Sequence, residues 1–585
     1  MGVEGFKGFF YRSHQFKKCF TKKLPDKVSS LYIDCNGIFY AAAAKVYLTG
    51  EKNGIPVNSD SDRKKLMKKS KKNLEKLHFK VITEIIIKHI DTVHPEDNLI
   101  IAVDSVVNSA KMNQQKQRRF MTSLENDPYQ IFEKVSITPG TEFMKKLDAY
   151  LEDWISTYEG YLPKKTIYSS HLSHGEGEHK IFDYIRRGDI VPGEGAQVIG
   201  GLDNDLIILS VVSPLRNIYM RPENGTDMVD VDKLRVEIIN QMNFEGADKE
   251  AIIRDFCVVC TLLGNDFLHK FPNVFKDFSK TIPLIFKVYK WTKKHLTDKN
   301  NNIIWKNYLI FLRGYDTYNM KKEPLFVQVY LNPPKFPYKE IEDNIIVRDN
   351  DGNRVNQVYD KTKHSLSFNY NKFSREWYQK QFNGNIVQWD GEIFTTYNKE
   401  LIFNMCINYL QTVQWVQYYY TKGYKYVSNL HSYHYLYNPL IGSVTTTLRD
   451  LINANETSVL SDIKKKEDEI EITPIHQLLS VVSKTNLDLI PKEYHSLYAN
   501  FLEDLNPSEF EIFEENYSKE HQRLANLPLV NLPFINKLLE ERGFINHDDL
   551  EFKEDLVILR DSDSDSVVIE TDSEEEYSIS QQNLI

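Results

Sequence analysis

The stretch Leu31-Tyr32-Ile33-Asp34 sets three consecutive apolar residues directly before an acid. Short apolar runs recur at Leu99 to Val103, at Val198-Ile199 and at Leu206 to Leu209, and longer segments with helical periodicity separate them. Such alternation between residue 29 and about residue 315 is typical of an α/β fold in which helices cover both faces of a parallel sheet.

The rest of the chain divides by composition. The polar run Asp349 to Asn353 predicts a linker over residues 342–367, after an α/β domain over residues 1–341. The helical periodicity of Leu401 to Tyr420 predicts a second, mostly helical region over residues 368–545. Residues 561–576 carry eight acids and no base, so residues 546–585 are expected to be a disordered acidic tail.

Composition excludes several classes of protein. The formal net charge of -9 argues against a protein whose whole surface binds nucleic acid, so any such site must be a local basic pocket. The five cysteines are too few for a disulfide framework in 585 residues, which favours a reducing compartment. No segment has the about 20 apolar residues that span a membrane, so we expect no contact with a membrane. We also expect an intracellular monomer, with the cytoplasm favoured over the nucleus.

Acidic residues stand at the ends of the predicted strands, at the start of one predicted helix and at the probable end of another. Because the carboxyl ends of parallel strands share one edge of a sheet, these acids can converge although they are far apart in the sequence. Any single one could instead cap a helix or form a turn. Together they would repel one another unless divalent cations were bound, and oxygen ligands favour two Mg²⁺ or Mn²⁺ ions, as in two-metal phosphodiesterases. The seven residues are Asp34, Asp104, Glu176, Glu178, Asp203, Asp205 and Asp266.

Two basic segments follow. Lys111, Gln115, Arg118 and Arg119 are spaced to lie on one face of a helix, a few residues beyond Asp104. Guanidinium groups there could bind a phosphate, although a solvated basic face gives the same pattern. The run from Arg63 to Lys72 resembles either a localisation signal or an exposed loop, and we favour a loop that contacts RNA phosphates.

These residues resemble the Xrn-type 5′→3′ exoribonucleases. The similarity covers roughly residues 1–540, in the family's order, and the segments GEGEHK and KMNQQ are very specific. The matching segments are Met1 to Val3 with Phe9, Leu31 to Gly37, Lys111 to Phe120, Ile137 to Met144, Gly175 to Ile181, Gly201 to Ile208, Leu262 to Leu268, Tyr409-Leu410 with Gln414 to Val416 and Tyr418 to Tyr420, Tyr433 to Tyr435, and Leu532 to Ile535.

The resemblance implies a parallel-sheet nuclease domain of the PIN/FEN type and assigns roles to single residues. The seven acids would be the metal ligands and catalytic residues, and the four residues of the basic face would bind the 5′-phosphate. Tyr40 stands where the family stacks a histidine on the first base. Two tryptophans of the family are replaced by Val427 and Asn429, and Ser105 and Asn108 replace a glycine and a proline.

The expected activity is 5′→3′ degradation of single-stranded RNA that carries a 5′-monophosphate. Two metal ions would activate water, and nucleoside 5′-monophosphates would be released. A 5′→3′ DNA exonuclease or flap endonuclease is the first alternative. A catalytically impaired RNA-binding homologue is the second.

The acidic tail suggests a protein partner. Val557-Ile558-Leu559 and Val567-Val568-Ile569 are each followed by acids and serines, as in the SUMO-interaction motifs that add a strand to a sheet edge. The alternative is a tail that serves only solubility.

Overall fold

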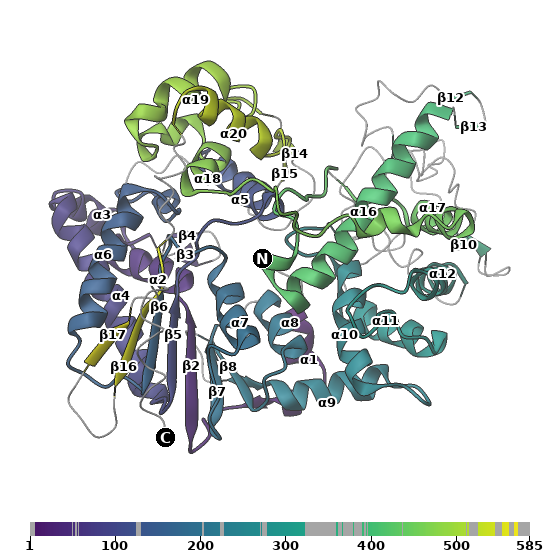
Figure 1. The fold of residues 1–585 in the computed structure, drawn as a ribbon, viewed down its shortest axis with the longest axis horizontal. Helices are drawn as coiled ribbons and strands as arrows, with labels where there is room; N and C mark the ends of the chain where they lie inside the picture. The colour runs from purple at the N-terminus through teal and green to yellow at the C-terminus, as the bar shows by residue number, and fades with distance from the viewer. Residues whose placement is uncertain are drawn as a thin grey trace.

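A nine-stranded sheet lies at the centre of the computed structural model (Figure 1). Five neighbouring strands, β8, β7, β2, β5 and β6, are parallel, and the strands at both ends are antiparallel. In spatial order the strands are β1 (Phe20–Thr21), β9 (Met228–Asp230), β8 (Ile218–Arg221), β7 (Ala196–Gly200), β2 (Val28–Asp34), β5 (Asn98–Ala102), β6 (Lys165–Ser169), β16 (Leu556–Arg560) and β17 (Val567–Glu570).

The structure describes most of the chain. The described residues are 6–49, 51–52, 55–56, 58–124, 130–201, 204–222, 227–269, 271, 278–321, 359–360, 365–366, 378, 389–390, 393–394, 396–435, 437–510, 512–513, 524–544, 553–560 and 567–570.

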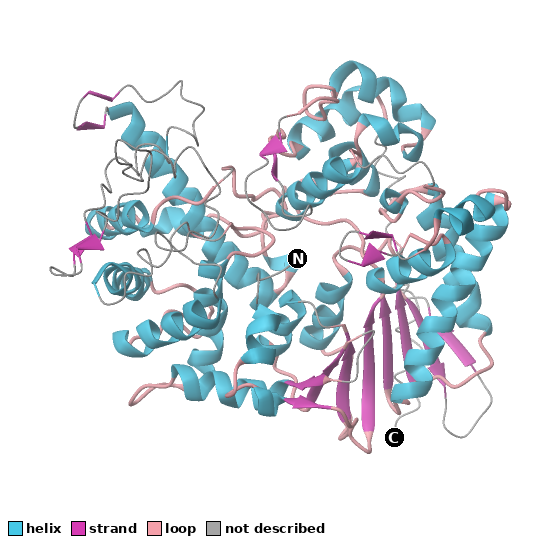
Figure 2. Cartoon of the chain, turned by 180° about the vertical axis from the view of Figure 1, so that it is seen from behind, coloured by secondary structure: helices cyan, strands magenta, loops and turns pink. Residues whose placement is uncertain are grey.

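Helices cover both faces of the sheet, as Figure 2 also shows. Along β2, Leu31 and Ile33 are buried on one face and Tyr32 on the other, because successive side chains of a strand point in opposite directions. The α/β prediction is therefore confirmed. The first face packs against α2 (Asn36–Val46), α4 (Lys71–Val93) and α6 (Glu142–Thr157), and the second against α7 (Gly177–Arg187), α8 (Asn204–Val212), α9 (Val231–Met242) and α10 (Lys249–Cys260).

One apolar run of the sequence is not a strand. Leu206 to Leu209 lies in the middle of α8 and is buried on all sides. A short run of apolar residues cannot distinguish a fully buried helix from a buried strand by periodicity, which is why the pattern misleads here.

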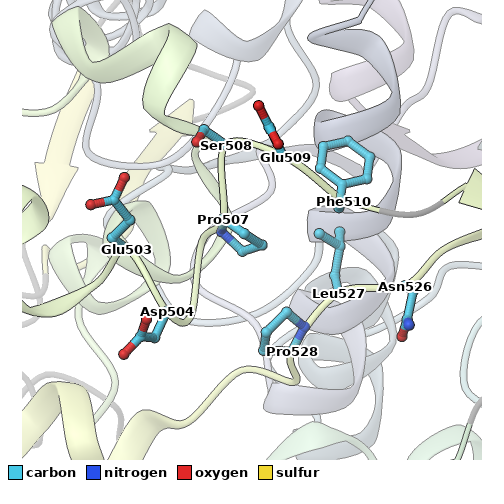
Figure 3. Close-up of a pocket in the computed structure, with 9 residues that line it drawn as sticks. All are labelled: Glu503, Asp504, Pro507, Ser508, Glu509, Phe510, Asn526, Leu527 and Pro528. Atoms are coloured by element: carbon cyan, nitrogen blue, oxygen red, sulfur yellow. The ribbon is translucent and has the colours of Figure 1, made fainter. Parts of the chain in front are cut away.

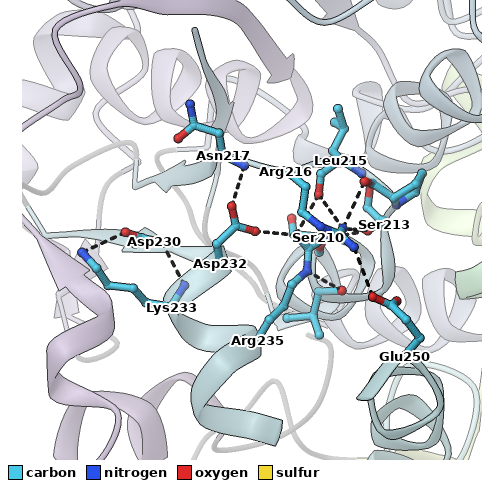
Figure 4. A network of polar contacts seen from close by, with 12 residues as sticks. Ser210, Ser213, Leu215, Arg216, Asn217, Asp230, Asp232, Lys233, Arg235 and Glu250 are labelled. Atoms are coloured by element: carbon cyan, nitrogen blue, oxygen red, sulfur yellow. Dashed lines mark hydrogen bonds and ion pairs between the residues drawn. The ribbon is translucent and has the colours of Figure 1, made fainter. Parts of the chain in front are cut away.

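The carboxyl end of α8 is held by one buried arginine (Figure 4). Arg235 of α9 donates hydrogen bonds to the carbonyl oxygens of Ser210, Val211 and Ser213, which end α8 or follow it. Its Nη1 also donates to Asp232 at 2.7 Å. These contacts satisfy the carbonyl groups that a helix end leaves unpaired, and so fix the helix whose first turn carries Asp205.

The predicted helical region is confirmed as mostly helical. The long helix α16 (Thr396–Lys422) packs into the core of the α/β region. Helices α18 (Pro474–Val481), α19 (His495–Phe501) and α20 (Leu532–Glu541) form a separate core with the helix α5 (Ser109–Thr122), above the carboxyl ends of the strands in Figure 1. The predicted linker over residues 342–367 lies outside the described residues, except for the short strands β10 (Tyr359–Asp360) and β11 (Ser365–Leu366), and the domain boundaries remain predictions.

The remaining elements of the described chain lie around these layers. The longer helices are α1 (Phe6–Arg12), α3 (Asp60–Leu66), α11 (Phe278–Thr292), α12 (Trp305–Lys321) and α17 (Ile441–Ala454), and the short strands are β3 (Glu51–Lys52), β4 (Ile55–Pro56), β12 (Trp389–Asp390), β13 (Ile393–Phe394), β14 (Ile512–Phe513) and β15 (Leu524–Ala525). Among the helices that the structure describes, none has the length and apolar character needed to cross a lipid bilayer.

The structure differs from the expectation of a disordered tail over two segments. Strand β16 pairs antiparallel with β6, β17 pairs with β16, and Ile558 is 2 % exposed. The apolar run Val557-Ile558-Leu559 provides apolar surface that is buried against the sheet and stabilises the strand, although the segments around it are acidic. Because this run is already paired on both sides in the structure, it is not free there to add a strand to the sheet edge of a partner, and the proposed SUMO motif stays a prediction. The other residues of the tail after residue 560 lie outside the described ones.

Candidate active site

Asp34 and Asp104 lie together at the carboxyl edge of the sheet. Asp34 ends β2 and is in register with Ala102 of β5, two residues before Asp104. Asn36 joins the two strand ends: its Nδ2 donates to Asp104 Oδ2 at 2.7 Å, and its Oδ1 accepts from the Asp104 amide at 3.2 Å. Sequence patterns gave Asn36 no role, although it directly follows Asp34-Cys35.

The two glycines of Gly175-Glu176-Gly177-Glu178 allow α7 to begin against these acids. A Cβ at Gly177 would lie 2.7 Å from Asp34 Oδ1, and the Gly177 amide donates to Asp104 Oδ1 at 2.7 Å. Gly175 has a φ of 106° and lies against the ring of Tyr424, where a Cβ would approach within 2.9 Å. Glu176 occupies the N-cap position, but its side chain makes no capping hydrogen bond. Its carboxylate is therefore available to the site.

Lys111 lies among the carboxylates. Its Nζ is 2.5 Å from Glu176 Oε2 and 2.9 Å from Asp266 Oδ2, and its side chain is 13 % exposed. Burial alone would lower the pKa of Lys111, but the carboxylates of Asp266 and Glu176 raise this pKa well above its ordinary value. In the structure the ammonium group of Lys111 is a counter-ion of the acids, and its expected role as a phosphate ligand stays a prediction.

The acids are close enough to shift one another's pKa values. Burial, followed by the charges of Asp205 and Glu176, raises the pKa of Glu178 well above its usual range. Burial and Asp266 raise the pKa of Asp205 to about 7. Burial and Glu176 raise the pKa of Asp104. Such shifts are expected of several carboxylates that share one water-poor site.

Six of the seven predicted acids thus lie at one site, and Asp203 lies outside the described residues. The donor set consists of oxygen atoms, which suits a hard divalent cation. Within the described ranges, however, no three acidic, histidine or cysteine side chains are grouped closely enough to hold one metal ion. The ammonium group of Lys111 forms ion pairs with Glu176 and Asp266 in this structure.

The helical region contributes two tyrosines to the site. The Tyr419 hydroxyl donates to Glu176 Oε1 at 2.5 Å, and the Tyr420 hydroxyl donates to Asp205 Oδ1 at 2.9 Å. Tyr419 also stacks on Trp415, with ring centroids 4.7 Å apart, and Phe267 packs edge-on against both rings. The run Tyr418 to Tyr420 was visible in the sequence, but only the packing of α16 shows which two hydroxyls reach the acids.

The other residues of the predicted phosphate pocket lie along α5. The charges of Arg119 and Arg118 act on the pKa of the Tyr40 phenol, and the charges of Tyr40 and Asp104 act on the pKa of Arg119. Tyr40, Asp104, Arg118 and Arg119 are therefore close to one another. Burial lowers the pKa of Arg119 to about 10. Its Nη1 is buried and makes no hydrogen bond to any described residue. Gln115 accepts from Gln477 of α18 at 3.0 Å.

The opposite face of α5 is fixed to the helical region. Lys116 Nζ donates to the carbonyl oxygens of Leu505 at 2.6 Å and Pro528 at 2.8 Å, and burial lowers the pKa of Lys116 to about 7. Gln117 exchanges two hydrogen bonds with the backbone of Ala525. The two backbone segments border a pocket of about 700 Å³ (Figure 3), which is lined by Glu503, Asp504, Pro507, Ser508, Glu509, Phe510, Asn526, Leu527 and Pro528.

The departures from the family pattern have local explanations. Asn108 caps α5 by accepting from the Lys111 amide at 2.9 Å. Val427 is fully buried, and the carbonyl oxygen of Asn429 accepts from the Ser109 amide at 2.8 Å, at the start of α5. Asn429 therefore lies beside the helix that carries the basic face, but its side chain offers no aromatic surface for a base.

The fold and the site together define a class. An α/β domain with acids at the carboxyl edge of its parallel strands and a basic helix beside them has the arrangement of a metal-dependent nuclease domain. Residues 1–223 match the family model described as "XRN 5'-3' exonuclease N-terminus", and residues 371–578 match the one described as "Xrn1 helical domain". The chain belongs to the Xrn family of 5′-3′ exonucleases.

Curated relatives carry the same family name. The chain is 22 % identical to "5'-3' exoribonuclease 1" of Saccharomyces cerevisiae, over 90 % of this chain and 42 % of that protein. It is 23 % identical to "5'-3' exoribonuclease 1" of Homo sapiens, over 88 % of this chain and 32 % of that protein. It is 29 % identical to "5'-3' exoribonuclease 2" of Arabidopsis thaliana, over 36 % of this chain and 29 % of that protein. The chain thus spans less than half the length of these relatives.

Proposed function

We propose that this chain is a 5′→3′ exoribonuclease that degrades single-stranded RNA with a 5′-monophosphate to nucleoside 5′-monophosphates. The observation that carries the proposal is the group of six acids at the carboxyl edge of the sheet, with a basic helix directly beside it. The names of the relatives support the direction of hydrolysis and the choice of RNA.

Divalent cations fit the donor chemistry of this edge. Asp34, Asp104, Glu176, Glu178, Asp203, Asp205 and Asp266 would hold two Mg²⁺ or Mn²⁺ ions. Bound there, the ions would supply a nucleophilic water and stabilise the charge that develops on the leaving oxygen. The raised pKa values of Glu178 and Asp205 support this assignment, because a cation is what would keep such crowded acids ionised.

The residues of the chain bind and orient the substrate. Arg119, whose buried Nη1 has no partner among the described residues, would bind the 5′-phosphate together with Arg118 and Gln115. Tyr40 is 40 % exposed beside them and could stack on the first base. Tyr419 and Tyr420 hold Glu176 and Asp205 through their hydroxyls, and so orient the acids.

The test follows the release of mononucleotides from labelled RNA. The protein is incubated with Mg²⁺ and with RNAs that differ only in their 5′ end, namely monophosphate, triphosphate or hydroxyl, beside a DNA of matched sequence. We expect mononucleotides from the monophosphorylated RNA, fewer from the others, and none with EDTA. Degradation of the DNA in preference to RNA, or internal cleavage, would contradict the proposal.

The phosphate pocket is tested by the double variant Arg118→Ala/Arg119→Ala. Each charge-assisted contact is worth about 1.5–3 kcal/mol, and one such contact corresponds to a ten- to hundredfold loss, which should fall on monophosphorylated RNA alone. The measured quantity is the ratio of degradation rates for monophosphate and hydroxyl ends at fixed ionic strength. A solvated basic face would instead weaken both substrates equally and leave the ratio unchanged.

A further inference from the structure

A second basic surface lies outside the site. Residues 64–76 contain seven lysines and one acid in a chain with a net charge of -9. All seven lysines are exposed. The sequence suggested an exposed loop, but the segment forms the end of α3 (Asp60–Leu66), a short turn and the start of α4. We call this surface the lysine patch, and it consists of Lys64, Lys65, Lys68, Lys69, Lys71, Lys72 and Lys76.

Few acids neutralise the lysine patch. Lys65 lies 3.5 Å from Asp62 at the exposed surface, and Glu75 instead lies 3.7 Å from Lys146. The charge of Lys71 acts on the pKa of Glu133, but these two residues form no ion pair. Over the described chain, the lysines 68, 69, 71, 72 and 76 make no ion pair with a described acid. The first turn of α4 contains no acid either, so the helix dipole adds to the positive potential there.

The topology places the lysine patch at the same edge of the sheet as the acids. Helix α4 ends at Val93, shortly before β5 begins at Asn98, so its other end points towards the carboxyl edge. With 23 residues the helix is about 34 Å long, longer than the strands it covers. Figure 1 shows α3 at about the height of α5.

A contact between helices α4 and α2 also places the lysine patch near Tyr40, the residue that we propose stacks on the first base. The ring of His78 on α4 lies 3.0 Å from the carbonyl oxygen of Phe39, and Phe39 precedes Tyr40 on α2. Lys71 stands seven residues before His78, about 10 Å along the helix axis. A strand that enters the site past Tyr40 therefore meets the lysine patch within a few nucleotides.

We infer that the lysine patch binds the phosphate backbone of the RNA that has not yet entered the active site. The inference rests on the proposed function, because that function makes RNA the substrate. Lysines on long stems bind phosphates as point charges without reading the sequence, so the contact suits an enzyme that must move along any RNA. The acids elsewhere on the surface would repel RNA, so the patch also favours one approach to the site.

The test compares two charge-matched variants. The patch variant replaces Lys68, Lys69, Lys71 and Lys72 with glutamine. The control variant replaces Lys22, Lys23, Lys27 and Lys88 with glutamine; these are also exposed lysines, but they lie at the amino edge of the sheet or near the far end of α4. Binding is measured in EDTA, with monophosphorylated RNAs of about five and about 40 nucleotides, since single-strand sites occupy only about 4–16 nucleotides.

We expect the patch variant to bind the long RNA about tenfold more weakly than the wild type at moderate salt, and the logarithmic salt dependence to become shallower by up to about 3, at roughly 0.7 per lost contact. Short RNA should bind all three proteins equally, and the control variant should match the wild type. Equal binding of long RNA by the patch variant and the wild type would overturn the inference.

Two further outcomes are distinguishable. If the lysine patch held the chain's own acidic residues 571–585 instead of RNA, the patch variant would bind long RNA more tightly than the wild type, which would overturn the inference. If the proposed function failed, the wild type would hydrolyse neither RNA with Mg²⁺, whereas the binding measurements in EDTA would still report on the patch.

Discussion

Replacing Lys111 with methionine tests how the acids are neutralised. Methionine keeps an unbranched apolar side chain but removes the ammonium group, which lies 2.5 Å from Glu176 and 2.9 Å from Asp266. The side chains of these acids are only 6 % and 2 % exposed. Removing one partner of a buried ion pair costs about 3–5 kcal/mol, because the other charge is left without compensation. We expect the metal-free variant to lose stability by about this amount.

Thermal unfolding in EDTA measures the loss. The entropy of unfolding is about 2.1 cal/mol/K per residue, so the expected loss corresponds to roughly 4–7 °C for a cooperative unit of about 320 residues. The matched control is Arg118→Met, which removes one positive charge from the same helix at an exposed position. Exposed substitutions of this kind change stability by no more than about 0.5 kcal/mol.

Added Mg²⁺ tests whether the acids also bind divalent cations. If the acids bind divalent cations, saturating Mg²⁺ should stabilise Lys111→Met more than it stabilises the wild type, because the cations replace the missing charge. A variant that melts like the wild type in EDTA would refute the counter-ion role of Lys111. Equal stabilisation of both proteins by Mg²⁺ would argue against cation binding at these acids.

Three further predictions concern other parts of the structure. Tyr420→Phe removes the hydroxyl that donates to Asp205, a hydrogen bond to a charged group worth about 1.5–3 kcal/mol, so turnover of RNA should fall about ten- to hundredfold. The control Tyr418→Phe removes a hydroxyl that donates to Asn302 and should retain activity; equal rates of the two variants would refute a role of the Tyr420 hydroxyl in turnover. Burial lowers the pKa of Lys116 to about 7 in the folded state, so the unfolded chain binds more protons than the folded one between pH 7 and about 10. The stability of the wild type relative to Lys116→Met should therefore rise with pH in this range, by at most about 1.4 kcal/mol per pH unit. Denaturant unfolding at pH 6, 7.5 and 9 measures the stability difference between the two proteins, and a difference that does not change with pH would contradict the prediction. Ile558→Ala should cost about 2–4 kcal/mol because Ile558 is buried in the sheet, whereas Leu559→Ala at a half-buried position should cost less, and a free tail would show no loss for either in thermal unfolding.

The convergence of Asp34 and Asp104 could be predicted because it depends on sheet geometry alone. Once Leu31 to Ile33 and Leu99 to Val103 are assigned to parallel strands, Asp34 and Asp104 must lie at one edge. The spacing of Lys111 to Arg119 likewise fixed one face of α5. Both predictions depend only on regular backbone geometry, the shared edge of parallel strands in one case and the helical repeat in the other.

Contacts made across the chain could not be predicted in this way. Lys111 shares a helix face with Arg118 and Arg119, but its side chain extends to Glu176 and Asp266 because those acids attract it more strongly than solvent does. Strand β16 escaped prediction because five residues between acidic segments carry a weak pattern, and they become a strand only by pairing with β6 and β17. Pairing of this kind depends on tertiary structure rather than on local sequence.

The two regions of the chain form one site rather than a nuclease domain with an accessory domain. Tyr419 and Tyr420 of α16 bond Glu176 and Asp205, and α5 is held from behind by the backbone carbonyls of Leu505 and Pro528. The acids and the basic face are thus each fixed by residues more than 200 positions away in the sequence. Separating the regions would leave Lys116 buried without its acceptors, or exposed to water, and would free the hydroxyl partners of two acids. The α/β region alone should therefore bind RNA weakly and position its acids poorly, even though it contains every one of them.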